Sequence, residues 1–307
     1  MSGGGELARR VAFGVIAAPL TVAILLYGDW PLAALLAVAS ALGAWEFFRI
    51  ARASGLNPLD DVGIAISGLI PLIVHARVLR LYDPNGRVGP LSLIAVVLLA
   101  LLALAIWMRG VSGKPLGAVA ATAFGVAYTG GMLTFGYAIR YHDYAAAPAR
   151  LSIDGRSFTL AAGGLLLLLP VLVTWASDIG AYAVGRTLGR HKLIPSVSPG
   201  KTVEGSIGGL LASMLVALVY TRFVLHPAAQ LDFHLPPFGI LIFGALVSAV
   251  AQLGDLAESL LKREGGVKDS SHLIPGHGGI LDRFDSLLFV LPTAFVLFGF
   301  MLTWAPT

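Results

Sequence analysis

Long apolar stretches alternate with short charged segments along the whole chain. A bilayer core needs roughly 20 mostly apolar residues per transmembrane helix, with about 17 to 25 tolerated. Stretches that approach this length without Asp, Glu, Lys or Arg lie at about 11–27, 31–45, 62–76, 88–108, 116–139, 157–177, 206–221, 237–254 and 286–304. The pattern predicts an all-α polytopic integral membrane protein with about nine transmembrane helices, and it leaves counts of eight and ten open.

Composition agrees with this class. Of the 307 residues 57% are hydrophobic and 12% are charged, whereas a soluble domain is about 25% charged. The absence of cysteine excludes disulfides and thiolate chemistry. The net charge of +4 is better explained by loops that face anionic lipid headgroups than by nucleic acid. We therefore expect membrane lipids, and no nucleic acid, as partners.

Basic residues in short loops set the orientation of a membrane protein. With nine spans and a cytoplasmic N-terminus, fourteen of the 21 basic residues lie on the cytoplasmic side. The two longest polar segments, 178–205 and 255–285, then lie there as well. We expect a single helical membrane domain over 1–307, with its catalytic part at about 157–307 and its active site facing the cytoplasm, at the inner membrane if the source is bacterial.

Acidic residues are concentrated at the ends of the segment 255–285. Asp282 and Asp285 are three residues apart and share one face if a helix begins near them, while Asp255 shares a helical face with Ser259 and Lys262. Carboxylates gathered at a membrane surface repel one another unless a cation neutralises them, and oxygen ligands suit Mg²⁺. The alternative is ion pairing of the acids with neighbouring basic residues.

Basic residues and glycines lie between these acids. Lys262, Arg263 and Lys268 are followed by the turn PGHGGI. Basic side chains and the backbone N–H groups that glycines expose can form a phosphate cradle before a helix. His277 in this turn could bind phosphate or carry a proton, whereas His272 is expected to be incidental. The positive-inside rule alone would explain the lysines, but not the adjacent acids and glycines.

The segment 178–205 holds a second group of candidate residues. Asp178 ends an apolar stretch, where a carboxylate is functional by default, with snorkelling to the interface as the alternative. Lys201 and Thr202 in SPGKT resemble phosphate ligands on a turn. A P-loop is excluded because the motif requires glycine at 195, where this chain has Pro195. No GxSxG or HExxH motif occurs either.

The residues from Ser259 to Asp285 resemble the signature of phosphatidate cytidylyltransferases, the CDP-diacylglycerol synthases. The matching positions are Ser259, Leu261, Lys262, Arg263, Lys268, Asp269, Ser271, Ile274, Pro275, His277, Gly278, Gly279, Ile280, Asp282, Arg283, Phe284 and Asp285. The upstream SPGKTVEG resembles the same family's SPxKTxEG segment, with Gly200 where lysine is frequent.

The resemblance implies condensation of CTP with phosphatidic acid to give CDP-diacylglycerol and pyrophosphate, dependent on Mg²⁺, with a second cation open. The expected catalytic residues are Asp255, Asp282, Asp285, Lys268 and His277. The expected metal ligands are the same three aspartates, with Asp178 open as a further one. The expected binding residues for CTP and the lipid phosphate are Lys201, Thr202, Ser259, Lys262, Arg263, Gly278, Gly279 and Arg283.

Two other functions remain open from the residues alone. A cytidylyltransferase or CTP-dependent kinase for another membrane lipid would carry similar loops. An ion-coupled transporter would use Asp178 and Asp255 for a coupling ion, but it predicts charge near the bilayer midplane rather than at span ends. The acyl preference, the residues that recognise cytosine and a homodimeric state also stay open.

Overall fold

The computed structural model describes residues 3–78, 89–141, 148–153, 156–228, 237–274 and 278–302. Within these ranges the chain is mainly helical, with two small antiparallel hairpins. Eight helices are long and apolar enough to cross a membrane, and the described apolar part of a further helix, Gly14–Tyr27, is shorter. The predicted all-α polytopic class is confirmed, whereas the count of nine spans is not.

The chain forms two compact units, each built from separated segments. Unit 1 consists of Met1–Gly28, Ala138–Leu260 and Phe284–Thr307, and unit 2 consists of Asp29–Tyr137 and Leu261–Arg283. The helices α6 (Met132–Arg140), α10 (Pro237–Glu264) and α11 (Leu281–Leu302) contribute residues to both units.

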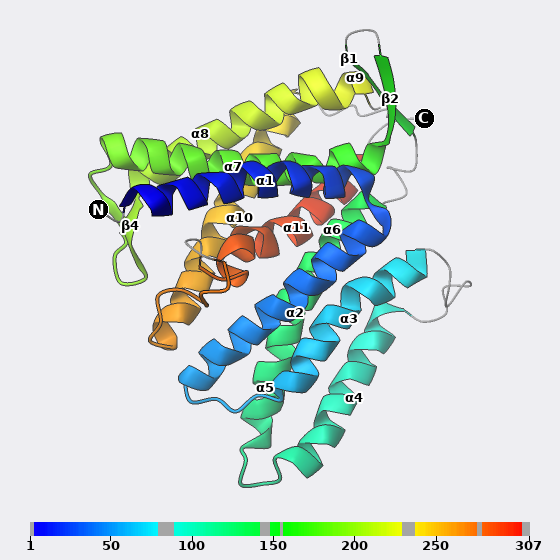
Figure 1. Ribbon diagram of the computed structural model, residues 1–307, viewed down its shortest axis with the longest axis vertical. Coiled ribbons are helices and arrows are strands. Elements are labelled where there is room, and N and C mark those ends of the chain that lie inside the picture. The colour runs from blue at the N-terminus through cyan, green and yellow to red at the C-terminus, as the bar shows by residue number, and fades with distance from the viewer. Residues whose placement is uncertain are drawn as a thin grey trace. The chain divides into compact units, whose positions relative to one another are not determined.

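Unit 1 is centred on α7 (Ala162–Leu188), which packs against α1 (Gly3–Tyr27) and α8 (Val203–Tyr220) (Figure 1). The run Leu165–Leu169 is buried on all sides, as expected for a helix surrounded by others. The remaining elements of unit 1 are β1 (Pro148–Ile153), β2 (Arg156–Ala161), β3 (Lys192–Ile194), β4 (Ser198–Thr202), the π-helical turn η3 (Thr221–Leu225) and α9 (His226–Ala228).

Unit 2 contains α2 (Asp29–Ala53), α3 (Asp60–Val78), α4 (Pro90–Met108) and α5 (Pro115–Val126), which run side by side (Figure 1). Most of the apolar side chains of α4 are exposed, which suits a helix that faces lipid. The π-helical turn η1 (Ala127–Gly131) interrupts the span predicted at 116–139, at its Thr-Gly-Gly sequence. Such turns are local insertions into an otherwise α-helical path.

Three predicted boundaries were wrong. The span expected at 157–177 begins at Ala162, because Arg156–Ala161 forms strand β2 and pairs with β1. The absence of charge in this stretch does not distinguish strand from helix. At the other ends, α7 continues through Leu188 and α10 through Glu264, so the polar segments 178–205 and 255–285 both begin as helix. Asp178 and Arg186 therefore stand on the helical extension of α7, and Asp255, Lys262 and Arg263 on that of α10.

Candidate active site

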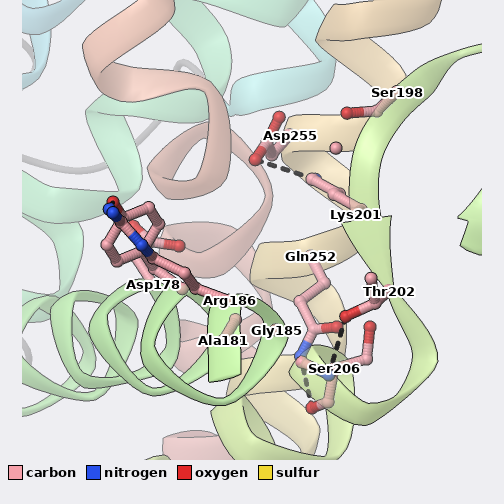
Figure 2. Close-up of a pocket in the computed structure, with 13 residues that line it drawn as sticks. Asp178, Ala181, Gly185, Arg186, Ser198, Lys201, Thr202, Ser206, Gln252 and Asp255 are labelled. Atoms are coloured by element: carbon pink, nitrogen blue, oxygen red, sulfur yellow. Dashed lines mark hydrogen bonds and ion pairs between the residues drawn. The ribbon is translucent and has the colours of Figure 1, made fainter. Parts of the chain in front are cut away.

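A cavity of about 450 Å³ lies in unit 1 between α7, the β3–β4 hairpin, the start of α8 and α10. Its volume is within the range of about 300–1,000 Å³ that is usual for small-molecule sites. Polar and charged side chains converge on it from all four parts (Figure 2). Those used below are Asp178, Arg186, Lys201, Thr202, Gln252 and Asp255. The cavity thus combines two carboxylates with two cations.

Lys201 and Asp255 form an ion pair across this cavity. Lys201 Nζ on β4 lies 2.8 Å from Asp255 Oδ2 on α10 (Figure 2). The other oxygen of Asp255 is 3.4 Å from Ser259 Oγ, one helical turn further along α10. Three residues predicted from the sequence are therefore brought together at one place. The side chains are partly exposed, at 24% for Lys201 and 34% for Asp255, but the Nζ atom of Lys201 is itself buried in the pair.

The hairpin that carries Lys201 is fixed by a residue that the sequence analysis missed. The carboxylate of Glu204, in the first turn of α8, accepts hydrogen bonds from Arg190 N (3.0 Å) and His191 N (3.2 Å). It also lies 2.6 Å from His191 Nδ1. Glu204 thus ties the start of the hairpin to the helix that follows it. An acidic residue in a first helical turn is a recognisable signal that could have indicated this role.

Thr202 caps α8. Its Oγ1 accepts a hydrogen bond from Gly205 N at 3.1 Å, which satisfies one of the N–H groups that a helix start leaves unpaired. Thr202 also lines the cavity. Its contact with phosphate remains a prediction, and its position is set by this cap.

The α7 side of the cavity contributes Asp178 and Arg186 (Figure 2). Asp178 is exposed. Arg186 donates a hydrogen bond to Tyr182 Oη at 2.6 Å, one turn earlier on the same helix. Arg186 was absent from the predicted site, because its position in the helical extension of α7 was not foreseen. It gives the cavity a second cation for an anionic ligand.

A close approach of α10 and α11 lies directly beside Asp255. A Cβ atom on Gly254 would be 2.7 Å from the backbone oxygen of Asp285 and 3.1 Å from Ser286 Cα. Only glycine therefore allows the two helices to pack this closely. Within unit 1, Asp255 and Asp285 therefore both lie at this helix crossing. Asp255 directly follows Gly254 on α10, and Asp285 is one of the α11 residues that Gly254 meets. Asp285 Oδ1 also accepts a hydrogen bond from Ser286 N at 2.6 Å.

Asp282, in unit 2, is engaged by protein donors on both of its oxygens. Oδ1 forms a 2.6 Å ion pair with Lys262 Nζ, and both side chains are largely buried. Oδ2 accepts hydrogen bonds from Gly279 N (2.7 Å) and Ser270 N (3.1 Å), and it lies 3.0 Å from Ser270 Oγ. Ion pairing, the alternative considered for the acids, is thus observed for Asp282. The same contacts hold the turn before α11.

The other predicted residues of unit 2 are mostly exposed. Arg263 donates to the backbone oxygen of Val267 at 3.1 Å, and Arg283 is exposed in the first turn of α11. Lys268 lines a second cavity, of about 380 Å³, together with Arg49. Gly278 adopts a φ of 80°, a backbone conformation that favours glycine. His277 lies outside the described residues.

Carboxylate oxygens in unit 1 suit a magnesium ion. Among the residues that the structure describes, no group of three or more acidic or histidine side chains is placed to hold a metal. Mg²⁺ is, however, commonly held by one or two carboxylates together with substrate phosphates and water. Asp178 and Asp255, which line one cavity, are the candidate ligands there, and a metal would have to replace Lys201 at Asp255. Asp282 fits less directly, because its side chain is only 7% exposed and a metal would have to displace Lys262, Ser270 or Gly279 from it.

Comparison with known proteins covers nearly the whole chain. A sequence model described as the cytidylyltransferase family matches residues 8–301. A phosphatidate cytidylyltransferase of Synechocystis sp. is 32% identical over 296 residues, which is 94% of this chain and 94% of that protein. Phosphatidate cytidylyltransferases of Staphylococcus saprophyticus and Staphylococcus haemolyticus are 51% and 50% identical over 131 residues. This matched stretch covers 43% of the chain and 48%, about half, of the length of each staphylococcal protein.

Proposed function

This chain belongs to the cytidylyltransferase family, and we propose that it transfers CMP from CTP to phosphatidic acid, giving CDP-diacylglycerol and pyrophosphate. The observation that carries the proposal is the cavity of unit 1, where Lys201 and Asp255 lie 2.8 Å apart beside Asp178 and Arg186. Two polyanionic substrates can react only if cations reduce their mutual repulsion. A cavity that offers both cations and metal-binding carboxylates suits that task.

In the reaction, a phosphate oxygen of phosphatidic acid attacks the α-phosphorus of CTP. The new bond joins that oxygen to the α-phosphorus, the bond between the α- and β-phosphates breaks, and pyrophosphate leaves. A phosphate monoester is largely ionised near neutral pH, since its second pKa is about 6. The nucleophile therefore needs no strong general base, and no covalent enzyme intermediate is required.

The basic side chains would bind and orient the phosphates. We assign this role to Lys201 and Arg186, which line the cavity of unit 1, and Lys268, exposed in unit 2, is a further predicted phosphate ligand. A bound Mg²⁺ would neutralise charge on the phosphate oxygens, with Asp178 and Asp255 as its ligands in unit 1. Asp282 and Asp285 remain predicted ligands.

The membrane spans account for the lipid substrate, whose acyl chains can stay in the bilayer. We place the reactive loops on the cytoplasmic side, where CTP is found, because most basic residues fall there with nine spans. A reporter fused after Thr307 should then be active only if it works on the far side of the membrane. Activity of a cytoplasmic reporter at that position would rule out this combination of span number and orientation.

A panel of lipid acceptors tests the substrate. Detergent-purified protein would be incubated with CTP, Mg²⁺ and one lipid at a time: phosphatidic acid, other lipid phosphates, or lipid alcohols. We expect pyrophosphate and a CDP-lipid with phosphatidic acid. CDP release with a lipid alcohol alone would instead indicate a CTP-dependent kinase, and turnover with a different lipid phosphate alone would indicate another cytidylyltransferase.

A further inference from the structure

Glu46 is a fully buried acidic residue in the middle of unit 2. It lies on α2, and its exposed fraction is 0%. Its carboxylate contacts two separate parts of the segment that resembles the family signature. Oε1 accepts from Ser271 Oγ at 2.5 Å and from Ile280 N at 2.9 Å. Oε2 accepts from Ser270 Oγ at 2.8 Å and from Leu281 N at 2.6 Å.

All four partners of Glu46 are hydrogen-bond donors. A carboxylate only accepts, and each of its oxygens has room for two donors, so the partners match the acceptor capacity of the group. Ile280 N and Leu281 N lie at the start of α11, where the helix provides no partner for them. An acidic group at a helix start is also favoured by the helix dipole. Glu46 thus caps α11 from another helix.

The glycine before α11 is explained by the same contact. A Cβ atom on Gly279 would overlap both oxygens of Glu46 and the hydroxyl of Ser270. The Ser270 hydroxyl lies within hydrogen-bond distance of both Glu46 and Asp282. Glu46 is therefore linked through Ser270 to the carboxylate that holds Lys262. These contacts join α2 to the described parts of the loop that carries Lys268.

We propose that Glu46 is a positioning residue for the transferase reaction: it fixes the turn at Gly279–Leu281 and the Ser270–Ser271 pair, and thereby the placement of Lys268 and Asp282. The claim that Glu46 affects the reaction rests on the proposed function. The claim that Glu46 holds the loop in place rests on the contacts described above. Ser40 provides a contrast on the same helix. It is equally buried, at 0%, but no described residue forms a hydrogen bond with its Oγ.

The test compares Glu46→Gln with Ser40→Ala. Glutamine keeps the shape of glutamate but replaces one oxygen with an NH₂ group. Whichever way the amide turns, its NH₂ group faces one backbone N–H, which loses its acceptor, and one serine hydroxyl, which would have to rotate and accept instead. Ser40→Ala removes a buried polar atom of α2 without breaking a described contact. Both proteins would be purified in detergent.

The first measurement is trypsin cleavage after Lys268, which requires local opening of the loop but no enzymatic turnover. We expect Glu46→Gln to be cleaved at least about fivefold faster than wild type, since cleavage follows the population of the open form. The second measurement is the KM for CTP, which we expect to rise at least about threefold. Loss of folded protein alone would lower the maximal rate and leave KM unchanged.

If Glu46→Gln cannot be purified, Ser271→Ala removes one of the same four hydrogen bonds from the loop side and should change both measurements in the same direction, by less.

Cleavage rates and KM values in Glu46→Gln equal to those in Ser40→Ala would overturn the proposal. Faster cleavage with an unchanged KM would also overturn it, because Glu46 would then hold the loop without affecting the reaction. Absence of CTP turnover in wild type would refute the proposed function and leave the cleavage result to decide the structural part.

Discussion

Lys201 Nζ and Asp255 Oδ2 lie 2.8 Å apart and join the β3–β4 hairpin to α10 within the cavity of unit 1. We expect substrates to open the pair, because a phosphate competes for Lys201 and a cation competes for Asp255. Binding of nucleotide together with Mg²⁺ should release both residues at once, because each ligand replaces one partner of the pair.

Replacement of Lys201 tests its role as a phosphate ligand. A charge-assisted hydrogen bond to phosphate contributes about 1.5–3 kcal/mol, so Lys201→Ala should lower kcat/KM for CTP at least tenfold. Lys192→Ala is the matched control, since Lys192 is exposed on the same hairpin, pairs with Thr202 in the strand register and does not line the cavity. It should stay within about twofold of wild type. Equal effects at the two positions would remove Lys201 from the site.

Asparagine substitutions at positions 282 and 285 should distinguish a carboxylate that stabilises the fold from one that takes part in catalysis. Removal of one partner of the buried Lys262–Asp282 pair should cost about 3–5 kcal/mol. Asp282→Asn should therefore lower both turnover and the melting temperature. Asp285→Asn should abolish turnover and lower the melting temperature less. Near-normal activity of Asp285→Asn at limiting Mg²⁺ would contradict its assignment as a metal ligand.

A methyl group at position 254 should push α10 away from α11. The added carbon would meet the backbone of Asp285 and Ser286, which cannot rotate away as a side chain could. We expect Gly254→Ala to lower kcat at least tenfold by displacing Asp255, since small misplacements in an active site have large effects. Gly117→Ala on α5 is the control, because open space surrounds that position. Activity of Gly254→Ala equal to that of the control would show that this crossing does not matter.

The sequence predicted the fold class and some of the residues that meet in unit 1, though not Arg186 or Glu204. Apolar runs of bilayer length gave the helices, and Lys201, Asp255 and Ser259 stood out as charged or polar residues beside them. The ends of α7 and α10 were missed because the charge-free criterion stops at Asp178 and Asp255. Charged residues do not end a helix that extends into water, so both helices continue beyond them.

Glu46 shows what single-sequence reasoning misses. It follows the apolar stretch 31–45, where an acidic residue reads as the boundary of a span. Its partners Ser270, Ser271 and Leu281 are more than two hundred positions away along the chain. No local period or spacing indicates such a contact. The engagement of Asp282 by Lys262 was foreseen only as an alternative, because spacing alone does not distinguish a metal ligand from an ion pair.

The most direct test of the proposed reaction is to follow two labels of CTP with purified protein, phosphatidic acid and Mg²⁺. One sample carries the label on the α-phosphate and the other on the γ-phosphate. We predict that the α-label enters the lipid fraction and that the γ-label is released as pyrophosphate, since the bond between the α- and β-phosphates breaks. Entry of the γ-label into lipid would show phosphorylation instead. Failure of both labels to leave CTP would contradict the proposed reaction.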